Sequence, residues 1–181
     1  MSTRALYTFK GTQGDADWNV YKHHDGYPSG AAQTIKTAID WFAWGLPRYE
    51  SDEFAAAFCA AGKLHSIENV EQLVDWAKSY GPGGQYHASK GGGVRFMPSG
   101  NPSEVACQNC SDIEYRYEIS MGTPLPEYIE KRARNLPQAP MLLIKAFGGN
   151  WWDGVAKEKQ LYAGTFDKFY KWAMKKDKVA A

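Results

Sequence analysis

The sequence predicts an α+β fold in a single domain over residues 1–181, with a largely antiparallel sheet of about five or six strands and helices packed against it. Short runs of β-branched and aromatic residues flank a central stretch, 29–80, in which apolar residues recur at helical spacing. The run at 112–120 alternates as a half-buried strand does. The length of 181 residues suits one hydrophobic core, and no linker or repeat divides the chain.

The first part of the chain is expected to hold a hairpin followed by helices. Strand-forming side chains fill 4–10 and 18–24, and the turn residues between them predict a β-hairpin over 4–24. The first helix should begin at a cap formed by Ser29 and should end before Gly45.

Two more helices are placed by the same starting and stopping signals. Ser51 opens one of them with an acidic first turn, and Gly62 is expected to end it. Ser66 is expected to cap the next helix, which Gly81 and Pro82 close. The buried face of the middle helix is predicted to consist of Phe54, Ala57, Phe58 and Ala61.

The last part, 94–176, is expected to complete the sheet after a loop. In the strand at 112–120 one face should be buried and the other face, which carries Arg116, should be solvated. A final helix is expected to follow a cap at Thr165. The other predicted elements are strands at 94–97, 141–147 and 160–163 and a short helix at 126–134.

Composition excludes several classes of protein. The formal net charge is +1, so a dedicated nucleic-acid binder, which usually has a basic domain, is not expected. No apolar run approaches the ~20 residues of a membrane span, and the N-terminus lacks the apolar stretch of a signal peptide. Three cysteines, an odd number, do not indicate a disulfide framework. We therefore expect a cytoplasmic protein that does not act on membranes.

One short run carries the side chains of a ligand site. It follows a strand and precedes a helix, whose N-terminus offers backbone N–H groups and a positive dipole that favour an anion or phosphate. His24 and Asp25 also have the composition of a base with its orienting carboxylate. Turn formation and packing at a strand edge explain the same residues without a ligand. The candidate ligand residues here are His24, Asp25, Gly26, Tyr27, Ser29 and Gly30.

Two other motifs do not complete a site. Cys107 and Cys110 have the spacing of a zinc-binding pair, but a structural zinc needs four ligands and no second pair exists. They are expected to be incidental loop cysteines. The glycines at 91–93 lack the residue order and the following helix of a phosphate-binding loop, so a plain loop or a flexible lid remains. We expect no metal and no cofactor.

Aromatic residues make up 14% of the chain, which indicates either an aromatic-rich core or flat faces used for binding. Most of them lie on helix stripes or strand faces, where core packing explains them. Trp151 and Trp152 share a glycine-containing loop that cannot easily bury both, so they are interface candidates and favour a homodimer. Arg95 and Arg116 are candidate anion-binding groups, although Arg116 between two glutamates also fits cross-strand pairing.

Two separated patches carry a family resemblance. The run Tyr-Lys-His-His-Asp-Gly-Tyr-Pro at 21–28 and the run Tyr-Arg-Tyr at 115–117 resemble a group of small bacteriophage and prophage proteins of uncharacterised function. The matching positions in the first run are Tyr21, His23 and 25–28. The resemblance implies a viral accessory gene whose product acts in the host cytoplasm. It brings no established catalytic residues.

These observations lead to three hypotheses about function. The first is a non-enzymatic phage accessory protein that binds a host defence or regulatory factor, or a small nucleotide ligand, in a counter-defence role. The second is a nucleotide-directed hydrolase or transferase that uses His24 and Asp25. The third is a virion or structural interaction protein. Because no complete catalytic constellation is recognisable in the sequence, the first hypothesis is favoured.

Overall fold

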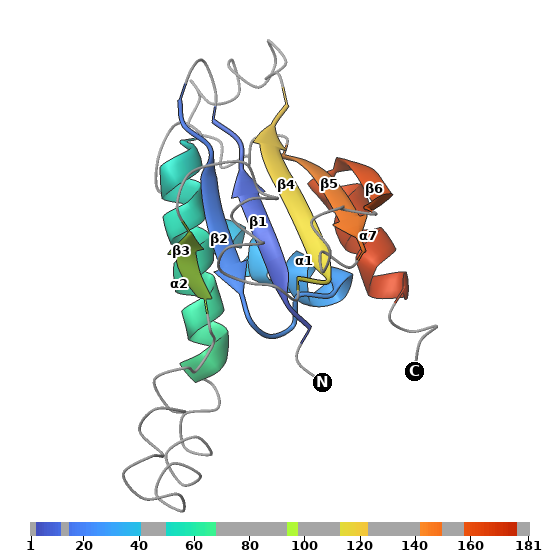
Figure 1. Ribbon diagram of the computed structural model, residues 1–181, viewed down its shortest axis with the longest axis horizontal. Coiled ribbons are helices and arrows are strands. Elements are labelled where there is room, and N and C mark those ends of the chain that lie inside the picture. Colours follow the sequence, from blue (N-terminus) through green and yellow to red (C-terminus); the bar gives the residue numbers. More distant parts are fainter. Residues whose placement is uncertain are drawn as a thin grey trace, which may run out of the picture.

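Among the described residues of the computed structural model, three helices cover one face of a six-stranded sheet (Figure 1). The helices are α1 (Pro28–Ala38), α2 (Ser51–Ile67) and α7 (Phe166–Lys176). This arrangement confirms the predicted α+β class. The structure describes residues 3–11, 15–40, 50–67, 94–97, 113–122, 142–149 and 158–176.

The strands of the sheet lie in the order β3-β2-β1-β4-β5-β6. Four of the five neighbouring pairs are antiparallel, as predicted, and the central pair β1–β4 is parallel. The strands are β1 (Ala5–Phe9), β2 (Trp18–Lys22), β3 (Val94–Met97), β4 (Tyr115–Met121), β5 (Leu142–Gly148) and β6 (Lys159–Thr165).

The predicted N-terminal hairpin is confirmed, and its first strand lies in the middle of the sheet. All five residues of β1 are buried, because side chains on both of its faces are covered. Ala5, Tyr7 and Phe9 belong to the core cluster under the helices. Leu6 and Thr8 alternate with them and therefore lie on the opposite face.

The start of α1 differs from the prediction. Tyr27 holds the N-cap position with an extended backbone, and Pro28 is the first helical residue. Ser29 lies inside the first turn and is not the cap, so that prediction was wrong. Proline suits the first position because its missing N–H has no helical partner there, and this preference outweighs the capping tendency of the serine. The stopping signal at Gly45 falls outside the described residues.

Helix α2 passes through both signals that were expected to divide it. Gly62 does not end the helix, and Ser66 lies within its last turn and is not an N-cap. The rest of the helix predicted up to Gly81 and Pro82 lies outside the described residues. A Cβ on Gly62 would be 2.5 Å from Cγ2 of Val94 in β3, so the glycine permits close packing of helix on sheet. The predicted buried face of α2, formed by Phe54, Ala57, Phe58 and Ala61, is confirmed.

The core is built from stacked aromatic rings. Tyr7 lies at the centre, with its ring centroid 4.4 Å from that of Phe58 and 5.0 Å from that of Tyr117. Phe169 of α7 packs edge-on against Tyr117 at 6.0 Å. Such pairs add about 0.5–1.5 kcal/mol each beyond the area they bury. Core packing thus explains the described part of the aromatic excess beneath the helices.

Strand β4 alternates as predicted on its inner face only. Tyr117 and Ile119 are buried against the helices. On the other face Arg116 is 7% exposed, so the expected solvated environment was wrong for this residue. Its burial depends on Glu158, a partner 42 residues away in the sequence that local alternation cannot reveal. The helix predicted at 126–134 lies outside the described residues.

Candidate functional site

The 24–30 turn (His24 to Gly30) joins β2 to α1 and is held firmly at Gly26. The Gly26 N–H donates to the carbonyl oxygen of Thr3 at 2.9 Å, and the Gly26 carbonyl accepts from the Tyr117 hydroxyl at 2.8 Å. A Cβ at this position would be 2.7 Å from Cβ of Ala5. Two hydrogen bonds and a close approach to β1 therefore fix this part of the backbone.

The backbone on either side of Gly26 is equally constrained. Asp25 has a φ of 54°, in the left-handed region that aspartate tolerates better than most residues. A Cβ on Gly30 would lie 2.3 Å from the carbonyl oxygen of Asp25, so only glycine allows the turn to fold back on the first turn of α1. Gly26 and Gly30 thus have structural reasons to be glycine.

The helix that follows presents its positive end at this turn. Tyr27, at the N-cap, makes no side-chain capping hydrogen bond, and the first turn of α1 contains no acidic residue. The positive end of the helix dipole is therefore not offset by a carboxylate in that turn. The side chains of His24, Asp25 and Tyr27 are exposed, whereas Ser29 is buried.

The two histidines before the turn have different environments. His23 Nδ1 lies 3.3 Å from Nε of Arg4 and 2.7 Å from the Tyr21 hydroxyl. Because an arginine nitrogen only donates, Nδ1 of His23 is an acceptor and the ring proton is on Nε2. His24 packs edge-on against His23, with ring centroids 4.5 Å apart.

His24 and Asp25 do not form the predicted dyad. No hydrogen bond joins them within the described residues, although they are adjacent in sequence. Partial burial lowers the pKa of His24, and the nearby charges of Arg4 and Lys22 lower it further, while the Asp25 carboxylate opposes the shift. The imidazole is therefore neutral at neutral pH and retains one donor and one acceptor nitrogen.

Lys22 is a residue of this region that the sequence reasoning missed. It is only 5% exposed, and its Nζ donates to Thr34 Oγ1 of α1 at 3.0 Å and to the Asp25 carbonyl at 3.4 Å. Burial lowers its pKa to about 8, against the opposing effect of Asp25. A signal was present in the sequence, because the alternation that places Val20 under the helices places Lys22 on the same face.

Tyr7 is the second missed residue. Its hydroxyl is fully buried and, among the described residues, is the one buried side-chain polar atom without a hydrogen-bond partner. Burial raises its pKa, and the nearby Asp25 carboxylate raises it further. Tyr7 and Lys22 are diagonal neighbours on the helix-covered face, since Ala5 pairs with Lys22 and Tyr7 pairs with Val20. Two hydrogen-bond donors thus lie beneath the turn.

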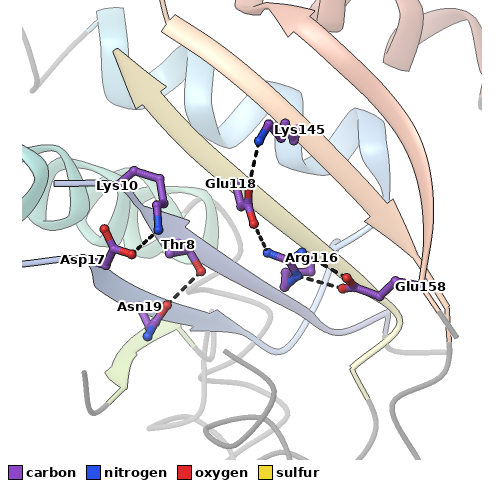
Figure 2. Close-up of polar contacts among 8 residues, drawn as sticks. All are labelled: Thr8, Lys10, Asp17, Asn19, Arg116, Glu118, Lys145 and Glu158. Carbon is purple, nitrogen blue, oxygen red and sulfur yellow. Dashed lines mark hydrogen bonds and ion pairs between the residues drawn. The ribbon is translucent and has the colours of Figure 1, made fainter. Parts of the chain in front are cut away.

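Arg116 belongs to a different cluster, on the sheet face away from the helices. Figure 2 shows its guanidinium between two carboxylates, with Nε 2.7 Å from Oε1 of Glu158 and Nη1 2.5 Å from Oε1 of Glu118. The guanidinium also lies 4.1 Å from the ring centre of Phe147. Glu118 contacts Lys145 at 3.6 Å, and the effect of burying this carboxyl is outweighed by Arg116, Lys145 and Lys10, which lower its pKa. These contacts do not bring Arg116 to the 24–30 turn.

The same face carries further paired polar side chains. Thr8 donates to Asn19 at 2.8 Å between β1 and β2, and Lys10 pairs with Asp17 (Figure 2). Arg95 pairs with Tyr21 in the β2–β3 backbone register, but its side chain lies outside what the structure describes. The interface candidates Trp151 and Trp152 and the cysteines Cys107 and Cys110 also lie outside the described residues.

The sequence runs 21–28 and 115–117 meet in space. Tyr117, from the 115–117 run, donates to Gly26 of the 21–28 run, and Tyr115 stacks on Tyr117 at 6.3 Å. Tyr21 contacts His23 within the first patch. The residues of these two runs therefore divide into those that build the turn and the exposed Asp25 and Tyr27, which the turn presents.

Comparisons with known proteins do not place the chain in a family: no family model, no curated protein and no solved structure matches it significantly. Among the residues described by the structure, no group of three or more His, Cys, Asp and Glu side chains is arranged to hold a metal ion. No helix in the described ranges is long and apolar enough to cross a membrane.

Proposed function

We propose that the protein is a non-enzymatic accessory protein of bacteriophage origin that binds a small anionic ligand of the nucleotide class at the 24–30 turn. One observation carries the proposal: a backbone fixed by Gly26 presents the exposed side chains of His24, Asp25 and Tyr27 at the positive end of α1. A site held in place before binding loses less conformational entropy when a ligand arrives.

The chemistry of these groups fits the parts of a nucleotide. The positive end of a helix favours phosphate, because the dipole and the backbone N–H groups both attract negative charge. Tyr27, at 36% exposure, presents part of its aromatic ring to solvent, and a base can stack on such a ring. His24, neutral at neutral pH, supplies one N–H donor without adding a titratable charge to the site.

The viral origin rests on the family resemblance and on the role its residues play. The shared Tyr117 and Gly26 are joined by a hydrogen bond that fixes the turn. A phage product of this kind acts in the host cytoplasm, where sequestering a nucleotide signal is a counter-defence activity. A host protein that docks on the same turn is the competing outcome.

The geometry favours binding over the hydrolase or transferase hypothesis. An imidazole that acts as a general base is commonly oriented by a hydrogen-bonded third group, and His24 contacts the ring of His23 without a hydrogen bond to Asp25. Turnover that disappears in a His24→Ala variant would reinstate the enzyme hypothesis. Stable self-assembly into large particles would instead support the virion hypothesis.

The test is to incubate the protein with a panel of nucleotides that includes cyclic dinucleotides, and to identify bound and released species by mass spectrometry. We expect an unchanged nucleotide to be recovered with the protein and to be lost in Tyr27→Ala. Phe96→Ala is the matched control, because Phe96 is an exposed aromatic, at 47%, outside the turn. Equal recovery from the two variants, or no recovery from the unmodified protein, would refute the proposal.

A further inference from the structure

Building on the proposed function, we propose that Lys22 and Tyr7 form the inner part of the anion site, with the Lys22 ammonium as its main charge and the Tyr7 hydroxyl as a second donor. The ligand group they recognise is a phosphate, whether free or part of a nucleotide. Neither residue belongs to the set of turn residues that the sequence singled out. Lys22 and Tyr7 thus add buried donors to a site that was otherwise defined by exposed side chains.

The first argument is that Lys22 has no salt-bridge partner among the described residues, although the Asp25 carboxylate is near enough to act on its ammonium. A buried charge is normally paired with an opposite charge, because desolvation without pairing is costly. In the described part of the chain Lys22 makes no ion pair, and its two hydrogen bonds go to neutral oxygens of Thr34 and Asp25. Thr34 Oγ1 already donates to the Gly30 carbonyl, so it accepts from Lys22. One N–H of the ammonium is left for another acceptor.

The second argument is the hydroxyl of Tyr7. An unpartnered buried polar group in a native protein calls for an explanation, and an acceptor absent from the structure is a common one. The ring of Tyr7 stacks on Tyr117, whose own hydroxyl reaches the turn at Gly26. The Asp25 carboxylate is close enough to influence the ionisation of Tyr7. The hydroxyl is therefore on the turn side of the core.

The third argument is that these groups and the helix all favour the same kind of ligand. Lys22 and Tyr7 are donors on one face of neighbouring strands, and the start of α1 above them is the positive end of a helix without an acidic first turn. The Asp25 carboxylate acts on Lys22 and Tyr7 through space but accepts a hydrogen bond from neither, so within the described ranges these donors lack a hydrogen-bonded anionic acceptor. A phosphate at the 24–30 turn supplies several acceptor oxygens, which can reach the donors directly or through one water molecule.

The contribution of Lys22 to phosphate binding can be measured by changing the pH, because the groups that face Lys22 keep their charge over the range in which Lys22 titrates. Among the described residues these groups are Asp25 and His24 of the turn, Tyr7 of β1 and the uncharged Thr34 of α1, with the guanidinium of Arg4 near His24. Between pH 8 and 9.5 His24 stays neutral, Tyr7 stays protonated and inorganic phosphate stays almost fully doubly ionised. Lys22, with a pKa of about 8, loses its charge in this range. Phosphate affinity should therefore fall as the pH rises.

The experiment measures binding of inorganic phosphate to the full chain by isothermal titration calorimetry. Lys22→Met keeps the length of the side chain and removes the charge, and we expect at least about tenfold weaker binding at pH 7, the size of one lost charge-assisted hydrogen bond. Lys63→Met removes an exposed charge of α2 and should stay within about twofold, as expected for a solvated lysine. Tyr7→Phe should weaken binding by a smaller factor.

Two further measurements detect misfolded variants and distinguish failure of this inference from failure of the proposed function. Circular dichroism reports the fold of each variant, and the pH dependence of the unmodified protein needs no variant at all. Equal phosphate affinity in Lys22→Met and Lys63→Met, or affinity that does not change between pH 8 and 9.5, overturns the inference and leaves ligand binding at the turn intact. An unmodified protein that binds neither phosphate nor any nucleotide overturns both.

Discussion

Replacing Tyr7 with phenylalanine should stabilise the protein in the absence of a ligand. The change removes a hydroxyl that is fully buried and unpartnered, and it keeps the ring that packs on Phe58 and Tyr117. An unsatisfied buried polar group costs about 1–3 kcal/mol. Relief of the lower part of that penalty, about 1–2 kcal/mol, corresponds to a melting temperature about 2–8 °C higher in a chain of this size.

Urea denaturation at neutral pH measures this effect, with a higher midpoint and an unchanged m-value as the expected result. Tyr117→Phe is the matched control, because it removes the same atom from the neighbouring ring. The Tyr117 hydroxyl donates to the Gly26 carbonyl, so this variant should lose about 1–3 kcal/mol instead. If Tyr7→Phe were destabilising like its control, the hydroxyl would have a partner and the reasoning would be refuted.

Three further predictions concern the turn and the sheet. Gly26→Ala should lower the free energy of unfolding by about 1–3 kcal/mol in urea denaturation, because the new methyl group would lie 2.7 Å from Cβ of Ala5. An unchanged urea midpoint would mean that the turn adapts to the methyl group without strain. Burial lowers the pKa of Lys22 to about 8 in the folded state, so between pH 8 and 10 the unfolded chain binds more protons than the folded chain. The free energy of unfolding should therefore rise over this range, by about 3 kcal/mol at most, and Lys22→Met should lack the rise. Arg116→Met should lower the free energy of unfolding by about 2 kcal/mol, because it leaves Glu158 unpaired. The double variant with Glu158→Gln should recover part of this loss, whereas additive losses in the two variants would contradict the pairing.

Local sequence patterns were sufficient wherever structure depends on neighbouring residues. The hairpin, the buried face of α2 and the inner face of β4 follow from periodicity, because each element buries one side against the same core. Gly62 shows the limit of this reasoning. A glycine that ends a helix and a glycine that admits Val94 look the same in sequence, and only the position of β3 distinguishes them.

The candidate site was predictable in part for the same reason. Turn chemistry identified Asp25, Gly26 and Gly30. The constraints on Asp25 and Gly30 are local, whereas Gly26 is also fixed by its close approach to Ala5. Lys22 and Tyr7 acquire their properties from α1 and from the stacked core, which no local pattern describes. Arg116 was expected near the turn or on a solvated face, and a distant glutamate buries it elsewhere.

The central claim is that an anion binds at the 24–30 turn, and the amide signals of its glycines test this most directly. In a titration with inorganic phosphate followed by ¹H–¹⁵N correlation spectra, the account predicts saturable shifts of Gly26 and Gly30 with one common dissociation constant. Gly148 and Gly164, in β5 and β6, serve as internal controls and should not move. Shifts that are absent at Gly26 and Gly30, or equally large at all four glycines, would contradict the account.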